Sequence, residues 1–163
     1  MEEEYFNYRI GQAHAYLERI RKLGDDCAAL QAEVEDARER ASGIVGIDYS
    51  RDAVSTTPND DGMVNAVESI RHAIRDYALK LSELLDERKK ASDALDHMND
   101  YTEAKALRLR YICCMDWESV CVQMHYTYDG MMKLRRRALC SYWEVMPMAE
   151  RDQIPLARPR EYD

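Results

Sequence analysis

Cysteine and histidine could bind a metal ion, but their spacing in this sequence does not favour a metal site. The five cysteines lie at positions 27, 113, 114, 121 and 140, and no pair has the Cys-x-x-Cys spacing. Cys121 and His125 are four residues apart, with Cys113 and Cys114 close in sequence. A structural zinc ion needs about four ligands. The pattern therefore favours small buried thiols, and the odd number of cysteines favours a reducing compartment.

The sequence supports nucleophilic or acid–base catalysis no better than it supports a metal site. Ser119 has no evident histidine and aspartate partners for a catalytic triad. The carboxylate pairs Asp25-Asp26 and Asp60-Asp61 suit helix caps and charged loops better than a general acid and base. No glycine-rich phosphate-binding loop occurs, since Asp61-Gly62 marks only a turn. We therefore predict that the protein is not an enzyme and uses neither a cofactor nor a metal ion.

The charge of the chain is unevenly distributed. The net charge is −8 over 163 residues. Residues 1–104 carry a net charge of −10, whereas residues 105–146 hold 7 basic and 4 acidic side chains, a net charge of +3. The net negative charge over most of the chain would repel nucleic acid. The net positive segment therefore indicates a function separate from that of the rest of the chain.

Within the basic segment, residues 116–145 have the pattern of a helix, a short turn and a longer helix. Asp116 can cap the first helix, and Thr127 can cap a second helix that runs from Tyr128 to about Val145. Each helix has an apolar face at helical spacing, formed by Trp117, Val120, Cys121 and Met124 and by Met131, Leu134 and Ala138. This outline is typical of a helix-turn-helix.

The other side of the longer helix could enter the major groove of double-stranded DNA. Lysine and arginine donate hydrogen bonds to guanine edges or to phosphates there. We assign Arg135 and Arg137 to the phosphate backbone. The candidates for base contacts are Tyr128, Asp129, Met132, Lys133 and Arg136. The predicted DNA-binding residues are Thr127, Tyr128, Asp129, Met132, Lys133, Arg135, Arg136 and Arg137.

The same segment resembles region four of bacterial sigma factors. The resemblance rests on Leu107, Leu109, Arg110, Tyr111 and Ile112, on Trp117, Glu118 and Val120, and on Tyr126, Thr127, Met131, Leu134, Ala138 and Leu139. With Tyr49-Ser50 and Val54-Ser55, the chain is similar over roughly residues 5–145 to phage-encoded transcriptional regulators of the ArpU/RinA type. The resemblance implies a cytoplasmic, DNA-binding regulator of phage or prophage late genes. It also places His125 where the turn usually has glycine, which requires a positive φ.

The first hundred residues carry two apolar stripes of helical period. One includes Phe6, Leu17, Cys27 and Val34, and the other runs from Met63 to Met98. The partner of each stripe is the other helix in an antiparallel hairpin, a second copy of the chain, or both in a four-helix dimer. The segment 43–62 is rich in helix breakers and predicts a long loop.

We therefore predict an all-α protein with a long, coiled-coil-like helical hairpin at 1–100, a helix-turn-helix at 101–146 and a flexible tail at 147–163. The predicted function is transcriptional regulation, with double-stranded DNA as the partner. The alternative is a coiled-coil interaction or scaffold protein that binds RNA polymerase or another protein. The acidic N-terminus and the lack of a long apolar run favour the cytoplasm and no membrane.

Overall fold

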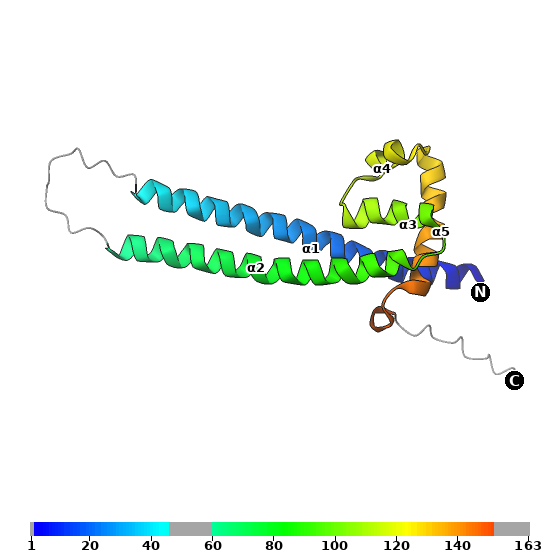
Figure 1. Cartoon of the computed structure of the whole chain (residues 1–163), viewed down its shortest axis with the longest axis horizontal. Coiled ribbons are helices and arrows are strands. Elements are labelled where there is room, and N and C mark those ends of the chain that lie inside the picture. The colour runs from blue at the N-terminus through cyan, green and yellow to red at the C-terminus, as the bar shows by residue number, and fades with distance from the viewer. Residues whose placement is uncertain (1, 46–59, 152–163) are drawn as a thin grey trace, which may run out of the picture. The chain divides into compact units, whose positions relative to one another are not determined.

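The computed structural model describes residues 2–45 and 60–151, and this part of the chain contains helices and no strand, which confirms the all-α class. Figure 1 shows the elements in chain order. The α-helices are α1 (Glu2–Val45), α2 (Asp60–Asp96), α3 (Tyr101–Leu107), α4 (Trp117–Met124) and α5 (Tyr128–Val145). A π-helical turn, η1 (Arg108–Ile112), follows α3, and a 3-10 turn, η2 (Met148–Glu150), follows α5.

The two long helices extend further than the sequence indicates. Helix α1 continues to Val45 and α2 begins at Asp60, so both ends of the predicted loop at 43–62 are helical. The middle of that loop, 46–59, lies outside the described residues. The predicted tail begins with η2, whose Glu150 pairs with Arg19 of α1 at 3.0 Å. Its remainder, 152–163, lies outside the described residues.

The chain divides into two compact units. Unit 1 combines Met1–Arg21 with Glu87–Asp163, and unit 2 is Lys22–Asp86. Both long helices therefore contribute to both units, whereas the sequence-based division places a boundary at residue 100.

All five α-helices contribute to the core of unit 1. Leu17 and Ile20 of α1 are fully buried, and Leu95 of α2 is 1 % exposed. Helices α3, α4 and α5 complete this core, to which they contribute Ala106, Leu107, Val120, Met131, Leu139 and Tyr142. The first turns of α1 are thus part of the unit that holds α5.

Unit 2 consists of the remaining parts of α1 and α2, which run side by side in opposite directions (Figure 1). Leu23, Cys27 and Val34 of α1 are buried, as is Leu84 of α2. These residues occupy helical spacing, so each helix buries one stripe against the other. Several further apolar side chains of α2 stay exposed.

Candidate nucleic-acid interface

The turn between α4 and α5 is fixed by side-chain caps and one left-handed residue. The Asp116 carboxylate accepts a hydrogen bond from the Ser119 N–H at 2.7 Å, and the Thr127 hydroxyl accepts one from the Gly130 N–H at 3.2 Å. His125 has φ 58° and ψ 42°, the left-handed conformation. The predicted caps, the span of α5 and the positive φ at His125 are confirmed.

The hydrogen bonds to the Asp116 carboxylate also affect its titration. The Ser119 backbone N–H is the largest cause that lowers the pKa of Asp116 below its ordinary value. Asp116 thus caps α4 in its charged form, which the positive end of a helix dipole favours.

A small apolar cluster holds α3, α4 and α5 together. It consists of Ala106, Val120, Cys121, Met131 and Leu134. Partly buried side chains surround it, among them Trp117, Met124 and Met132. Cys121 supplies little volume where α4 meets α5, so the two helices can approach closely. The cluster therefore fixes the direction in which α5 leaves the turn.

The first two turns of α5 present three of the predicted site residues to solvent. Tyr128 is 55 % exposed, and Asp129 and Lys133 are also exposed. Lys133 makes no hydrogen bond or ion pair with any residue of the described part of the chain. A lysine with this freedom can reach an anionic ligand without breaking an internal contact.

Two predicted site residues have internal packing roles. The side chain of Met132 packs against the apolar cluster. The Arg135 guanidinium lies 5.6 Å from the centre of the Trp117 ring, on which Arg110 also lies at 5.8 Å. Both residues therefore support α5 from the side of α3 and α4, and this role was not expected from the sequence.

Arg136 and Arg137 have partners within unit 1, yet their side chains remain exposed. Arg136 donates to the Asn7 side-chain oxygen at 3.1 Å and lies 5.8 Å from the Phe6 ring centre. Arg137 pairs with the buried Glu103 of α3 at 3.5 Å and keeps 66 % of its side chain exposed. Neither contact encloses the guanidinium, so both remain accessible to phosphate.

The start of α1 packs along the second half of α5, and the sequence analysis missed this. Arg9 lies between two aromatic rings, 4.6 Å from the centre of Tyr5 and 4.5 Å from that of Trp143, and pairs with Glu144 at 3.0 Å. The Trp143 indole donates to Gln12 at 2.7 Å. The available signal was a second row beside the apolar stripe, Tyr5, Arg9, Gln12 and Tyr16, at intervals of four, three and four.

The cysteines and acidic side chains form no metal site in the described part of the chain. There, no three histidine, cysteine or carboxylate side chains gather as metal ligands would. Cys27 and Cys121 are buried, Cys113 and Cys114 are exposed, and all five cysteines are free thiols. No helix among the described residues has the length and apolar character needed to cross a membrane.

Comparisons of the chain with protein-family models, with curated proteins and with solved structures found no match.

Proposed function

We propose that the chain binds double-stranded DNA through the first turns of α5 and acts as a transcriptional regulator of phage type. The observation that carries this proposal is the outward side of α5, where Lys133 has no internal partner and two arginines stay accessible. The capped turn before α5 supports it, because a helix held in this way can present one side to a groove.

The contacts within unit 1 suggest a division of roles. Tyr128 and Lys133, on the first two turns, approach the base edges, since residues early in a recognition helix make such contacts. Arg136 and Arg137 bind phosphates, which fix the register of the protein on the duplex. Met132 packs against the apolar cluster and Arg135 lies over the Trp117 ring, so both hold α5 against its neighbouring helices. Thr127 acts as the cap, and Asp129 lies at the edge of this surface.

The regulatory part of the proposal rests on the resemblance to sigma-factor region four and to ArpU/RinA-type regulators. That resemblance favours phage or prophage late genes as the target and the cytoplasm as the location. It assigns no catalytic residue, in agreement with the chemistry of the sequence.

Selection from a random duplex library, followed by fluorescence anisotropy with the full chain, tests DNA binding. We expect affinity to fall between about 50 and 200 mM salt, because binding releases counterions from the phosphates. Lys133→Ala should weaken specific binding by about 1–3 kcal/mol if Lys133 contacts a base. If Lys133 contacts a phosphate, the slope of log K against log salt should instead decrease in magnitude by about 1.

Lys89→Ala is the matched control, since Lys89 is exposed in unit 1 and has no partner among the described residues. It should leave DNA affinity unchanged. The absence of duplex binding by the full chain at low salt would contradict the proposal, and so would equal losses for the two lysine variants.

The second candidate function is a helical interaction protein that binds RNA polymerase without sequence-specific DNA binding. The net charge of −10 over residues 1–104 favours it, together with exposed apolar residues on α2. It predicts that a chain with Lys133→Glu and Arg136→Glu still recovers polymerase in a pull-down. The DNA-binding proposal predicts that this variant no longer binds duplex DNA.

A further inference from the structure

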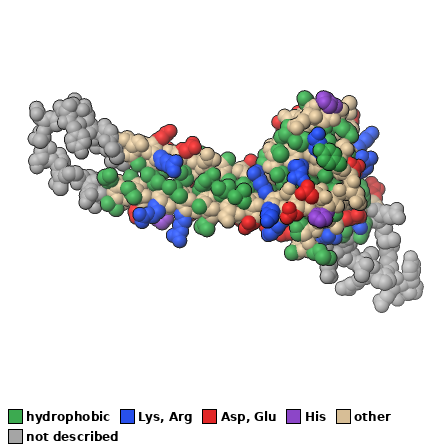
Figure 2. All heavy atoms as spheres, in the orientation of Figure 1, with side chains coloured by type: hydrophobic (Ala, Val, Ile, Leu, Met, Phe, Trp, Pro, Cys, Tyr) green, Lys and Arg blue, Asp and Glu red, His purple; other side chains and the backbone are tan. Residues whose placement is uncertain are grey.

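One side of α2 in unit 2 carries a row of exposed apolar side chains. Met63 is 54 % exposed, Val67 47 %, Ile74 41 % and Leu85 57 %, and Leu81 is partly buried. At 100° per residue these five positions fall within about 40° of one another around the helix. We call them the α2 strip. Figure 2 shows apolar side chains gathered along the helices of unit 2.

Helix α1 does not account for the α2 strip. The apolar stripe of α1 in unit 2, with Leu23, Cys27 and Val34, is already buried. A second apolar row of α2, which adjoins the strip around the helix, is buried or partly buried; it consists of Ala66, Ile70, Ala73, Tyr77 and Leu84. The apolar arc of α2 is therefore wider than one neighbouring helix covers. An exposed row of this length in a globular protein indicates an interaction surface.

The spacing of the α2 strip indicates what covers it. From Met63 through Val67, Ile74 and Leu81 to Leu85 the intervals are four, seven, seven and four residues. This series is the same in both directions, with Ile74 at its centre. A twofold interface between antiparallel helices pairs residues in this way, because each residue i contacts j of the partner while j contacts i.

We propose that the α2 strip binds a second copy of this chain, with the two α2 helices antiparallel and Ile74 next to the twofold axis. Val67 then lies opposite Leu81 of the other copy, and Met63 lies opposite Leu85. A helix of another protein would not require the palindromic spacing, whereas the same helix in reverse does. This inference is independent of DNA binding and requires only residues of unit 2.

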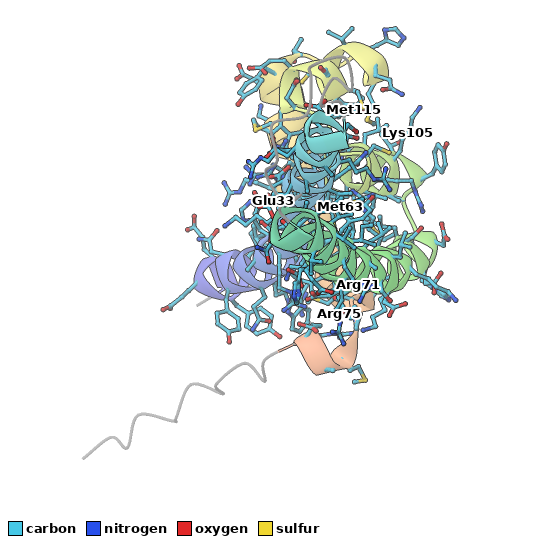
Figure 3. The ribbon with its side chains drawn as sticks, turned by 90° about the vertical axis from the view of Figure 1, so that its left-hand side faces the viewer. Glu33, Met63, Arg71, Arg75, Lys105 and Met115 are labelled. Carbon is cyan, nitrogen blue, oxygen red and sulfur yellow. The ribbon has the colours of Figure 1, made fainter. Side chains whose placement is uncertain are left out.

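Arg71 and Arg75 lie at one edge of the α2 strip, and they provide an additional prediction. Figure 3 labels both with Met63 in a view that looks along α2. In the antiparallel register the arginines of the two copies come to the same edge, although Glu68 of the same helix pairs with Arg71 at 3.4 Å. Because salt screens their repulsion, the dimer should not weaken as the ionic strength rises.

Sedimentation equilibrium of the full chain is the first test. We expect a concentration-dependent dimer, and Ile74→Lys should raise its Kd by about 100-fold or more, because two unpaired ammonium groups would be buried at the axis beside the arginines of both copies. Leu79→Lys is the matched control, since Leu79 is 66 % exposed on another side of α2. Circular dichroism of both variants checks that the helices persist.

Disulfide cross-linking tests the register. In a chain with Cys113→Ser and Cys114→Ser, which removes the exposed thiols, Ile74→Cys should cross-link to its own copy under mild oxidation. A mixture of Met63→Cys and Leu85→Cys chains should form the mixed dimer, and Met63→Cys alone should not. A monomer at every concentration would overturn the proposal, and a Met63→Cys homodimer would overturn its antiparallel geometry.

Discussion

At the scale of single residues, His14 is a titratable group whose surroundings disfavour its charged form. Its half-buried ring makes an edge-to-face contact with Tyr111, with ring centres 6.2 Å apart. Burial is the largest cause that lowers the pKa of His14, and the charges of Arg135 and Arg110 lower it further, while Glu18 raises it. The folded state thus favours neutral His14.

This environment predicts a loss of stability in mild acid. Because the pKa of His14 is lower in the folded state, the unfolded chain binds the proton first as the pH falls. The free energy of unfolding should decrease as the pH falls through about 6.5 toward the lower folded pKa. Urea unfolding at a series of pH values measures this decrease.

The matched variants are His14→Gln, which should remove the decrease in that window, and the exposed His72→Gln, which should retain it.

The carboxylates change the free energy of unfolding at lower pH. The pKa values of Glu18 and Glu87 lie below their ordinary value of 4.5, so their contributions are lost only as the pH falls through the range below that value. An unchanged decrease in His14→Gln would refute the role of His14.

At this scale the sequence predicts residue types better than their partners. It identifies Lys133 and the three arginines of α5 as one cationic set. It does not show that Arg136 donates a hydrogen bond to Asn7, which is 129 residues away in sequence. Arg137 likewise forms an ion pair with Glu103 of α3, which the sequence does not show. Periodicity places a residue on one side of its own helix, whereas the partner across the contact depends on tertiary packing.

At the scale of elements, the backbone at His125 limits the stability of the α4–α5 turn. A left-handed conformation costs a residue with a side chain about 1–2 kcal/mol. The His125 side chain is exposed, so it loses few contacts when removed. Glycine adopts this conformation readily but costs about 0.5–1 kcal/mol in the unfolded chain.

His125→Gly should therefore raise the free energy of unfolding by about 0.5–1 kcal/mol. His125→Ala removes the same imidazole but keeps a Cβ, so it should show no such gain. Urea unfolding of the two variants measures the difference. Equal stabilities for Gly and Ala at position 125 would show that the turn stores no backbone strain.

The elements were predictable where the sequence contains explicit start and stop signals. Thr127 and Pro147 flank α5, and the structure gives the predicted span Tyr128–Val145. At α3 both Asp100 and Thr102 are residue types that cap helices, and Asp100 is the cap, since its carboxylate accepts from the Thr102 and Glu103 N–H groups at 2.8 and 3.2 Å. Two capping residues stand close together there, and only their geometry decides between them.

At the scale of the whole molecule, the first 21 residues belong with the C-terminal helices. Leu17 and Ile20 are fully buried in the unit that contains α5, and Tyr16 stacks on Tyr142 with ring centres 6.4 Å apart. The apolar stripe of α1 alternates steps of four and three residues, except for one extra step of three from Ile20 to Leu23, beside Gly24. This irregular step coincides with the boundary after Arg21, where α1 passes from unit 1 to unit 2.

The units predict which fragments fold. A chain of residues 1–21 joined to residues 87–151 by a short glycine-rich linker should fold, since Arg19 and Glu87 already lie within 3.5 Å of each other. A fragment of residues 101–151 should fail, because it exposes Tyr142 and Leu139 that the rest of unit 1 buries. Circular dichroism and urea unfolding of the two fragments measure this difference.

Leu17→Ala in the joined chain should lower the free energy of unfolding by about 2–5 kcal/mol, as expected for a buried leucine. Cooperative unfolding of the 101–151 fragment with the stability of the joined chain would instead mean that α3, α4 and α5 form a domain without α1.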